Sequence, residues 1–100
     1  MTNEEMVAAQ EFCISHSVEM SFLYSLSEAG LLEITTLEET VFIKQDHLPE
    51  LEKWVRLHYD MDINLEGIET IHHLLQQIRT MQEEMKALKN RLNLYEKPDR

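Results

Sequence analysis

The chain has 100 residues, 43% of them hydrophobic, and a formal net charge of −10 at pH 7. This length corresponds to one small domain with a modest core. No stretch approaches the roughly 20 consecutive apolar residues of a membrane span. The first residues lack the basic segment and the apolar run of a signal peptide. Its one cysteine, Cys13, cannot form an internal disulfide, which agrees with a reducing compartment. We therefore expect a cytoplasmic protein.

The charge is distributed unevenly along the chain. Residues 1–43 contain eight glutamates and no lysine or arginine, and the first basic residue is Lys44. Residues 1–69 contain 3 basic and 15 acidic residues, a net charge of −12, whereas residues 70–100 contain 6 basic and 4 acidic residues, a net charge of +2. Such an acidic region repels phosphates and anionic lipids and attracts basic partners.

Two short helices are predicted at the N-terminus. In residues 5–14 the apolar side chains fall near one side of a helix, and two serines just after it indicate a break. Residues 19–29 form the second helix, which ends at Gly30 because glycine reaches positive φ without strain. Two short helices joined by a tight turn are typical of a helix-turn-helix.

A wing and a third helix are expected next. Residues 34–43 predict a β-hairpin, since β-branched residues cluster on both sides of residues 37–39. In the third helix, Asp46 is expected to cap the first turn and Pro49 to be tolerated within it. Residues 59–63 are expected to form a loop.

The last third of the chain carries a heptad repeat. Asn64 is expected to cap one long helix with Gly67 in its first turn. The apolar residues of its seam alternate at spacings of three and four: Ile71, Leu74, Ile78, Met81, Met85, Leu88, Leu92 and Tyr95. An isolated helix would leave this narrow apolar seam in water. We therefore expect a homodimer in which two seams pack together, with the helices parallel or antiparallel. The alternative is that the seam packs on the chain's own first two helices.

The order of these elements resembles the winged-helix domain of MerR-type regulators, as do the segments EAGLL (28–32) and INLEGIETI (63–71). Within this superfamily the chain is more similar to the chaperone-modulator (CbpM-like) family. That likeness rests on EFCI (11–14) with His16 two residues later, and on RLHYDMDINLEGI (56–68). The arginines of the MerR-type second helix are replaced here by serine and tyrosine.

Together, patterns and resemblance predict a mainly α fold in three parts. Residues 1–63 are expected to form a MerR-like winged helix-turn-helix domain, with a short β-hairpin wing and the helix that follows it. Residues 64–96 form the long coiled-coil helix that dimerises, and residues 97–100 a tail.

The resemblance implies a chaperone modulator that binds the J-domain of a DnaJ-like co-chaperone and inhibits its cooperation with Hsp70. The charge agrees with this function, because a helix-turn-helix binds DNA through arginine and lysine, whereas the basic helix that the family implies for J-domains is complementary to an acidic surface. The expected contact residues lie on the helix-turn-helix and wing: Glu11, Glu19, Met20, Phe22, Tyr24, Glu28, Glu38 and Glu39.

Several alternatives stay open. The chain could be a DNA-binding MerR-type transcriptional regulator or a bare coiled-coil assembly module. One of Phe22 and Leu23 is expected to be exposed, since adjacent helix residues diverge, although Phe22 and Tyr24 could instead complete the core. No enzyme activity, cofactor or metal site is expected, because no phosphate-binding glycine loop, catalytic set or chelating histidine pair is present, and Cys13 is expected to pack in the core.

Overall fold

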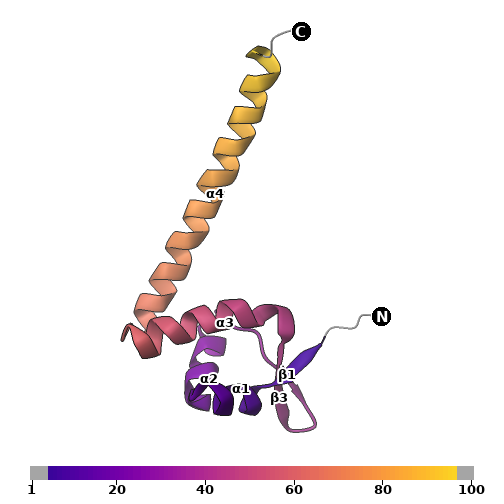
Figure 1. Cartoon of the computed structure of the whole chain (residues 1–100), viewed down its shortest axis with the longest axis vertical. Helices are drawn as coiled ribbons and strands as arrows, with labels where there is room; N and C mark the ends of the chain where they lie inside the picture. The colour runs from indigo at the N-terminus through magenta and orange to yellow at the C-terminus, as the bar shows by residue number, and fades with distance from the viewer. Residues whose placement is uncertain (1–4, 97–100) are drawn as a thin grey trace. The chain divides into compact units, whose positions relative to one another are not determined.

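The computed structural model describes residues 5–96 and, in that range, every side chain except that of Glu96 (Figure 1). The expected tail, residues 97–100, and the acidic residue Glu4 lie outside this range. The chain divides into two units, Met1–Glu69 and Thr70–Arg100. The elements in chain order are β1 (Met6–Ala8), α1 (Ala9–His16), α2 (Met20–Glu28), β2 (Thr35–Leu37), β3 (Thr40–Lys44), the 3₁₀ turn η1 (Gln45–His47), α3 (Leu48–Val55), the π-helical turn η2 (Arg56–Asp60) and α4 (Leu65–Glu96).

The three strands form one antiparallel sheet in the order β1-β3-β2. The expected hairpin is confirmed: β2 pairs with β3, and the two residues between them, Glu38 and Glu39, have φ values of 49° and 70°. Two consecutive positive φ values are those of a type I′ turn, whose twist matches that of the paired strands. The wing therefore projects two neighbouring glutamates at its tip.

The strand β1 corrects the expectation of one helix over residues 5–14. Val7 lies opposite Ile43 in the β1–β3 ladder, and the helix begins only at Ala9. The apolar residues of Met6–Ala8 therefore belong to the sheet, and those from Ala9 onward belong to the helix.

The helix-turn-helix itself is confirmed. Ser17 adopts the left-handed conformation after α1, and the backbone N–H of Val18 donates to the carbonyl of Cys13 at 2.9 Å. After α2, Gly30 has φ 80° and the N–H of Leu31 donates to the carbonyl of Leu26 at 2.9 Å, as expected for a glycine stop.

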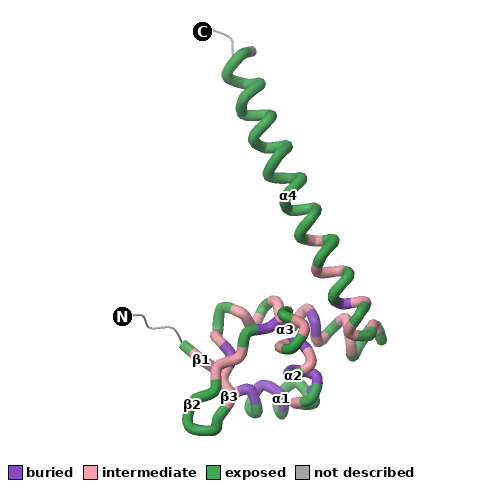
Figure 2. Tube along the Cα trace, turned by 180° about the vertical axis from the view of Figure 1, so that it is seen from behind, coloured by how far each residue is buried: buried purple, intermediate pink, exposed green. Residues whose placement is uncertain are grey.

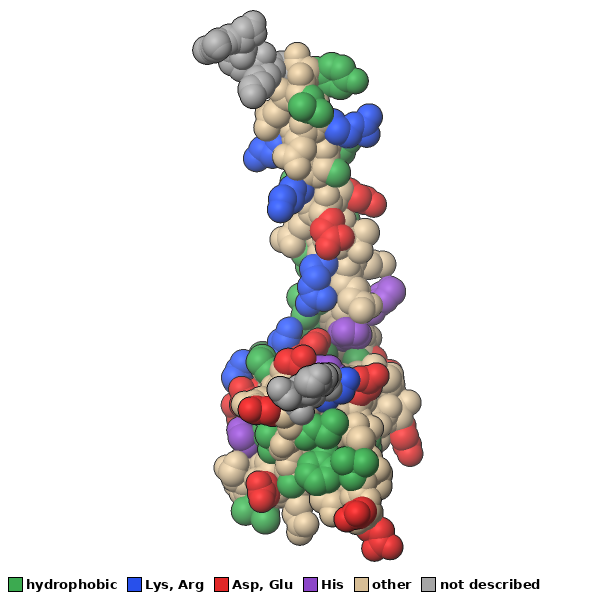
Figure 3. Space-filling model, turned by 90° about the vertical axis from the view of Figure 1, so that its right-hand side faces the viewer, with side chains coloured by type: hydrophobic (Ala, Val, Ile, Leu, Met, Phe, Trp, Pro, Cys, Tyr) green, Lys and Arg blue, Asp and Glu red, His purple; other side chains and the backbone are tan. Residues whose placement is uncertain are grey.

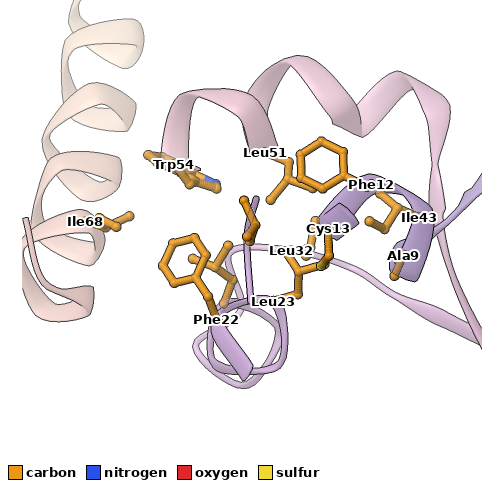
Figure 4. Close-up of a cluster of buried hydrophobic side chains, with 12 residues drawn as sticks. Ala9, Phe12, Cys13, Phe22, Leu23, Leu32, Ile43, Leu51, Trp54 and Ile68 are labelled. Carbon is orange, nitrogen blue, oxygen red and sulfur yellow. The ribbon is translucent and has the colours of Figure 1, made fainter. Parts of the chain in front are cut away.

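The core of the first unit joins helices α1, α2 and α3, the central strand and the first turn of α4 (Figures 2 and 4). The most deeply buried large side chains are Leu23, Leu26, Ile43, Leu51, Trp54 and Ile68. Fully burying a side chain of this kind stabilises the fold by about 1.5–3 kcal/mol. Because the buried residues of α2 face this core, the core determines which side of α2 remains exposed.

Two expectations between the wing and the long helix are wrong. Asp46 does not cap α3: it lies inside η1, and the residue that precedes α3 is His47, without a side-chain cap. The loop expected over residues 59–63 is wrong at its start and begins only after Asp60, because helical backbone continues through η2, whose wider turn brings His58 and Tyr59 against Phe22. Pro49 does lie in the first turn of α3.

The start of α4 follows the sequence expectation. The side-chain Oδ1 of Asn64 accepts a hydrogen bond from the backbone N–H of Gly67 at 2.8 Å, which makes Asn64 the N-cap. A Cβ atom at Gly67 would lie 2.6 Å from Cγ2 of Ile63, so this turn accepts only glycine without rearrangement.

Candidate protein-binding surface

The glutamates expected to contact a partner are all exposed. Glu11 lies on α1, Glu19 precedes α2, Glu28 ends α2, and Glu38 and Glu39 form the wing tip. In the face drawn in Figure 3, hydrophobic side chains gather on the globular unit and carboxylates surround them. The helix-turn-helix and wing therefore present an acidic surface, because their glutamates are exposed and residues 5–43 contain no lysine or arginine.

The structure brings three of the expected contact residues to one groove. Tyr24 is 45% exposed, Met20 is half-buried and Glu39 is exposed. The groove between α2 and the wing has a volume of about 320 Å³ and is lined by Gln10, Met20, Tyr24, Glu39, Thr40 and Val41. The other expected contact residues do not line it.

Sequence reasoning missed Gln10, Thr40 and Val41 as groove residues. Gln10 reaches the groove because α1 follows directly on β1, which pairs with β3 and thereby brings the start of α1 to the wing. The available signal was the short apolar run at residues 6–8, which fits a strand as well as a helix.

Phe22, one of the expected contact residues, is buried against η2. Its side chain is 7% exposed and that of Leu23 is 1% exposed, so the expectation that one of the two faces outward is wrong. Both are buried because α2 packs on two sides: Phe22 contacts the rings of η2 while Leu23 joins the central core. Tyr24 is the aromatic residue of α2 that stays accessible.

The beginning of α2 is fixed by a tyrosine that the sequence did not single out. The backbone N–H of Glu19 donates to the hydroxyl of Tyr59 at 3.1 Å. The N–H groups at the start of a helix have no partner within the helix, and Glu19 makes no side-chain cap. Tyr59 therefore connects η2 to the start of the exposed helix.

The family follows from a comparison with protein-family models. Residues 7–90 match the MerR HTH family regulatory protein. The chain belongs to the MerR family. The match agrees with the winged helix-turn-helix fold and with the resemblance to the chaperone modulators, which are MerR-like proteins. No curated protein and no solved structure matched the chain.

The long helix of this MerR-family protein exposes its seam (Figure 2). Ile71 is half-buried, and the other seven seam residues are exposed, from 45% at Ile78 to 85% at Tyr95. None of the helices in residues 5–96 combines the length and the hydropathy of a membrane-spanning segment.

Cys13 of the MerR-family chain is a core residue, as expected. It is buried, its thiol lies 3.4 Å from the sulfur of Met20, and burial raises the pKa of the thiol. Since the thiolate is the reactive form, this thiol is shielded from chemistry at neutral pH. No group of three or more metal-ligating side chains occurs in the part of the chain that the structure describes.

Proposed function

We propose that this MerR-family protein is a chaperone modulator: its acidic winged helix binds the J-domain of a DnaJ-like co-chaperone and inhibits its cooperation with Hsp70. The observation that carries the proposal is the charge of the surface that a DNA-binding relative would use. On the outer side of α2 lie Ser21, Tyr24 and Glu28, all exposed, and the wing tip adds Glu38 and Glu39.

This surface is poorly suited to a polyanion. Non-specific DNA affinity comes from neutralising phosphates with lysine and arginine, and residues 1–43, which include α1, α2 and the wing tip, contain neither. The same acidic surface favours a basic helix, since complementary charge accelerates the encounter of two proteins and excludes partners whose charge has the same sign as the surface. Inhibition would then follow from covering the surface that the J-domain offers to Hsp70.

The second candidate is a DNA-binding transcriptional regulator. It is favoured by the description of the matching family as regulatory and by the complete helix-turn-helix and wing. The acidic charge of the surface argues against DNA binding. The two candidates therefore predict different partners, a J-domain or duplex DNA, and one pair of titrations distinguishes them.

We further propose that two copies pair through the seam of α4. Six exposed leucine, isoleucine and methionine side chains recur on it at heptad spacing, and covering such residues stabilises an assembly by the same hydrophobic effect that stabilises a core. The pair would carry two acidic winged helices.

The experiment is calorimetric titration of the protein with the isolated J-domain of a DnaJ-like co-chaperone and, separately, with duplex DNA, both at physiological salt. We expect a J-domain complex, no DNA complex, and a reduced J-domain-stimulated Hsp70 ATPase rate. DNA binding without J-domain binding would reverse the assignment.

A matched pair of variants tests whether the charge acts locally. Glu28→Lys changes an exposed residue of α2, and Glu83→Lys makes the same change at an exposed position of α4 outside the seam. Loss of J-domain binding in the first variant alone supports the winged helix as the binding surface. Equal loss of binding in both variants would mean that the net charge of the protein, rather than a local charge on the winged helix, determines binding.

A further inference from the structure

We infer that the groove between α2 and the wing is a pocket for one arginine side chain of a basic partner helix. The inference rests on the proposed function, because it names the chemical group that the acidic winged helix would recognise. It concerns a site within the surface rather than the surface as a whole.

The size of the groove suits one long side chain. Its volume of about 320 Å³ is at the lower end of the range for small-molecule pockets, about 300–1,000 Å³. Its walls come from α2, the start of α1 and the beginning of β3, so backbone elements that the core holds in place define its shape.

The lining is divided between apolar and polar groups. Met20 and Val41 are half-buried and offer apolar contact, which suits the methylene stem of arginine. The exposed ring of Tyr24 offers a face on which a planar guanidinium stacks.

The polar groups that line the groove are suited to a cation. Glu39 supplies a carboxylate, and Gln10 and Thr40 supply neutral side-chain oxygens. Arginine presents five donors in a planar fork and forms bidentate pairs with carboxylates. Among the described residues, no lysine or arginine lines the groove, so the carboxylate faces no basic competitor there.

The wing tip provides a matched control for this pocket. Glu38 and Glu39 are adjacent, both exposed and both at positive φ, yet only Glu39 lines the groove. A general electrostatic attraction would treat the two carboxylates alike, whereas a pocket distinguishes them.

The test compares Glu38→Gln and Glu39→Gln in titrations with the J-domain. We expect Glu39→Gln to weaken binding about tenfold or more, as loss of a charge-assisted hydrogen-bonded pair does, and Glu38→Gln by no more than a few-fold, as for an exposed charge of the same surface outside the groove. Equal effects of the two substitutions would overturn the pocket. Thermal unfolding of both variants checks that the fold is intact.

The ring is tested by Tyr24→Phe and Tyr24→Leu. The first keeps an aromatic face and should keep binding, whereas the second removes the face and should weaken binding severalfold. Equal binding by the two variants would exclude stacking as the role of Tyr24.

A separate titration keeps the inference independent of the J-domain. N-acetyl-arginine amide and N-acetyl-lysine amide are titrated into the protein at millimolar concentration and followed by NMR. We expect the arginine compound to shift the amides of Tyr24, Thr40 and Val41 more than the lysine compound, and Glu39→Gln to abolish these shifts.

The two titrations separate the possible failures. Shifts without a J-domain complex would retain the pocket and reject the proposed function. A J-domain complex without arginine-dependent shifts in the groove would retain the function and reject the pocket.

Discussion

The ring of Phe22 stacks on the imidazole of His58, with ring centroids 4.5 Å apart and planes 13° from parallel. The ring of Tyr59 lies nearly perpendicular to the same phenyl ring, with centroids 5.6 Å apart. These contacts join α2 to η2, and the hydrogen bond from Glu19 to Tyr59 adds a second connection. The outward face of α2 depends on this aromatic cluster behind it.

We expect Phe22→Ala to lower the free energy of unfolding by about 3–5 kcal/mol, the usual cost of removing a buried phenyl ring. Urea unfolding followed by circular dichroism measures the change. Tyr24→Ala is the control, because that ring is 45% exposed and its removal should cost far less. Similar losses in both variants would contradict the division of α2 into a buried and an exposed aromatic residue.

Gly67→Ala should destabilise the protein, although alanine in a helix usually stabilises it by about 0.5–1 kcal/mol relative to glycine. The reason is the 2.6 Å approach of the new Cβ to Ile63. In an Ile63→Ala background the obstructing Cγ2 is gone, so Gly67→Ala should cost less there than in the natural chain. Additive effects in a double-mutant cycle from urea unfolding would refute this reason.

Glu38→Asn should stabilise the wing by about 0.5–1 kcal/mol, because asparagine tolerates the left-handed conformation that a type I′ turn demands. Thermal unfolding measures the effect. The same substitution at Glu33, which is not among the residues with positive φ, should give no gain. J-domain affinity should fall by no more than a few-fold, since Glu38 is an exposed charge that does not line the groove.

Leu88→Asp should dissociate the proposed dimer, because it sets a carboxylate in the apolar seam. Sedimentation velocity over a range of concentrations gives the oligomeric state. Leu94→Asp makes the same change at a residue that is more exposed, 78% against 61%, and lies outside the seam, so this variant should remain dimeric. A monomeric natural protein at high concentration would remove the premise.

The stability should decline at alkaline pH partly because of Cys13. Burial raises the pKa of this thiol, so the folded protein holds the thiol proton more tightly than the unfolded chain does. The contribution is fully present below the unfolded pKa, near 9.0, and is lost as the pH rises through the folded pKa. The difference in unfolding free energy between the natural protein and Cys13→Ala should therefore shrink above pH 9, and parallel profiles would contradict it.

Features fixed by local chemistry could be predicted from the sequence. Gly30 ends α2, Asn64 caps α4, and the glutamates expected at the surface are exposed, because each depends on a few neighbouring residues. The hairpin follows from its β-branched residues for the same reason.

Features that depend on distant pairing could not be predicted. The three residues of β1 become a strand only because β3, more than 30 positions later, supplies its hydrogen-bonding partners. The burial of both Phe22 and Leu23 likewise requires η2, whose rings cover the side of α2 that a single helix would expose. The groove could not be predicted for the same reason, since it brings together Gln10 of α1 and Val41 of β3, which lie far apart in the sequence.

The sheet order β1-β3-β2 leaves two edge strands, each three residues long. A partner that adds a strand to a sheet gains affinity from a row of main-chain hydrogen bonds, and edges this short offer few unpaired backbone groups. If a protein binds the winged helix, we therefore expect it to be recognised mainly through side chains, so that its sequence, rather than its capacity to become extended, decides whether it binds.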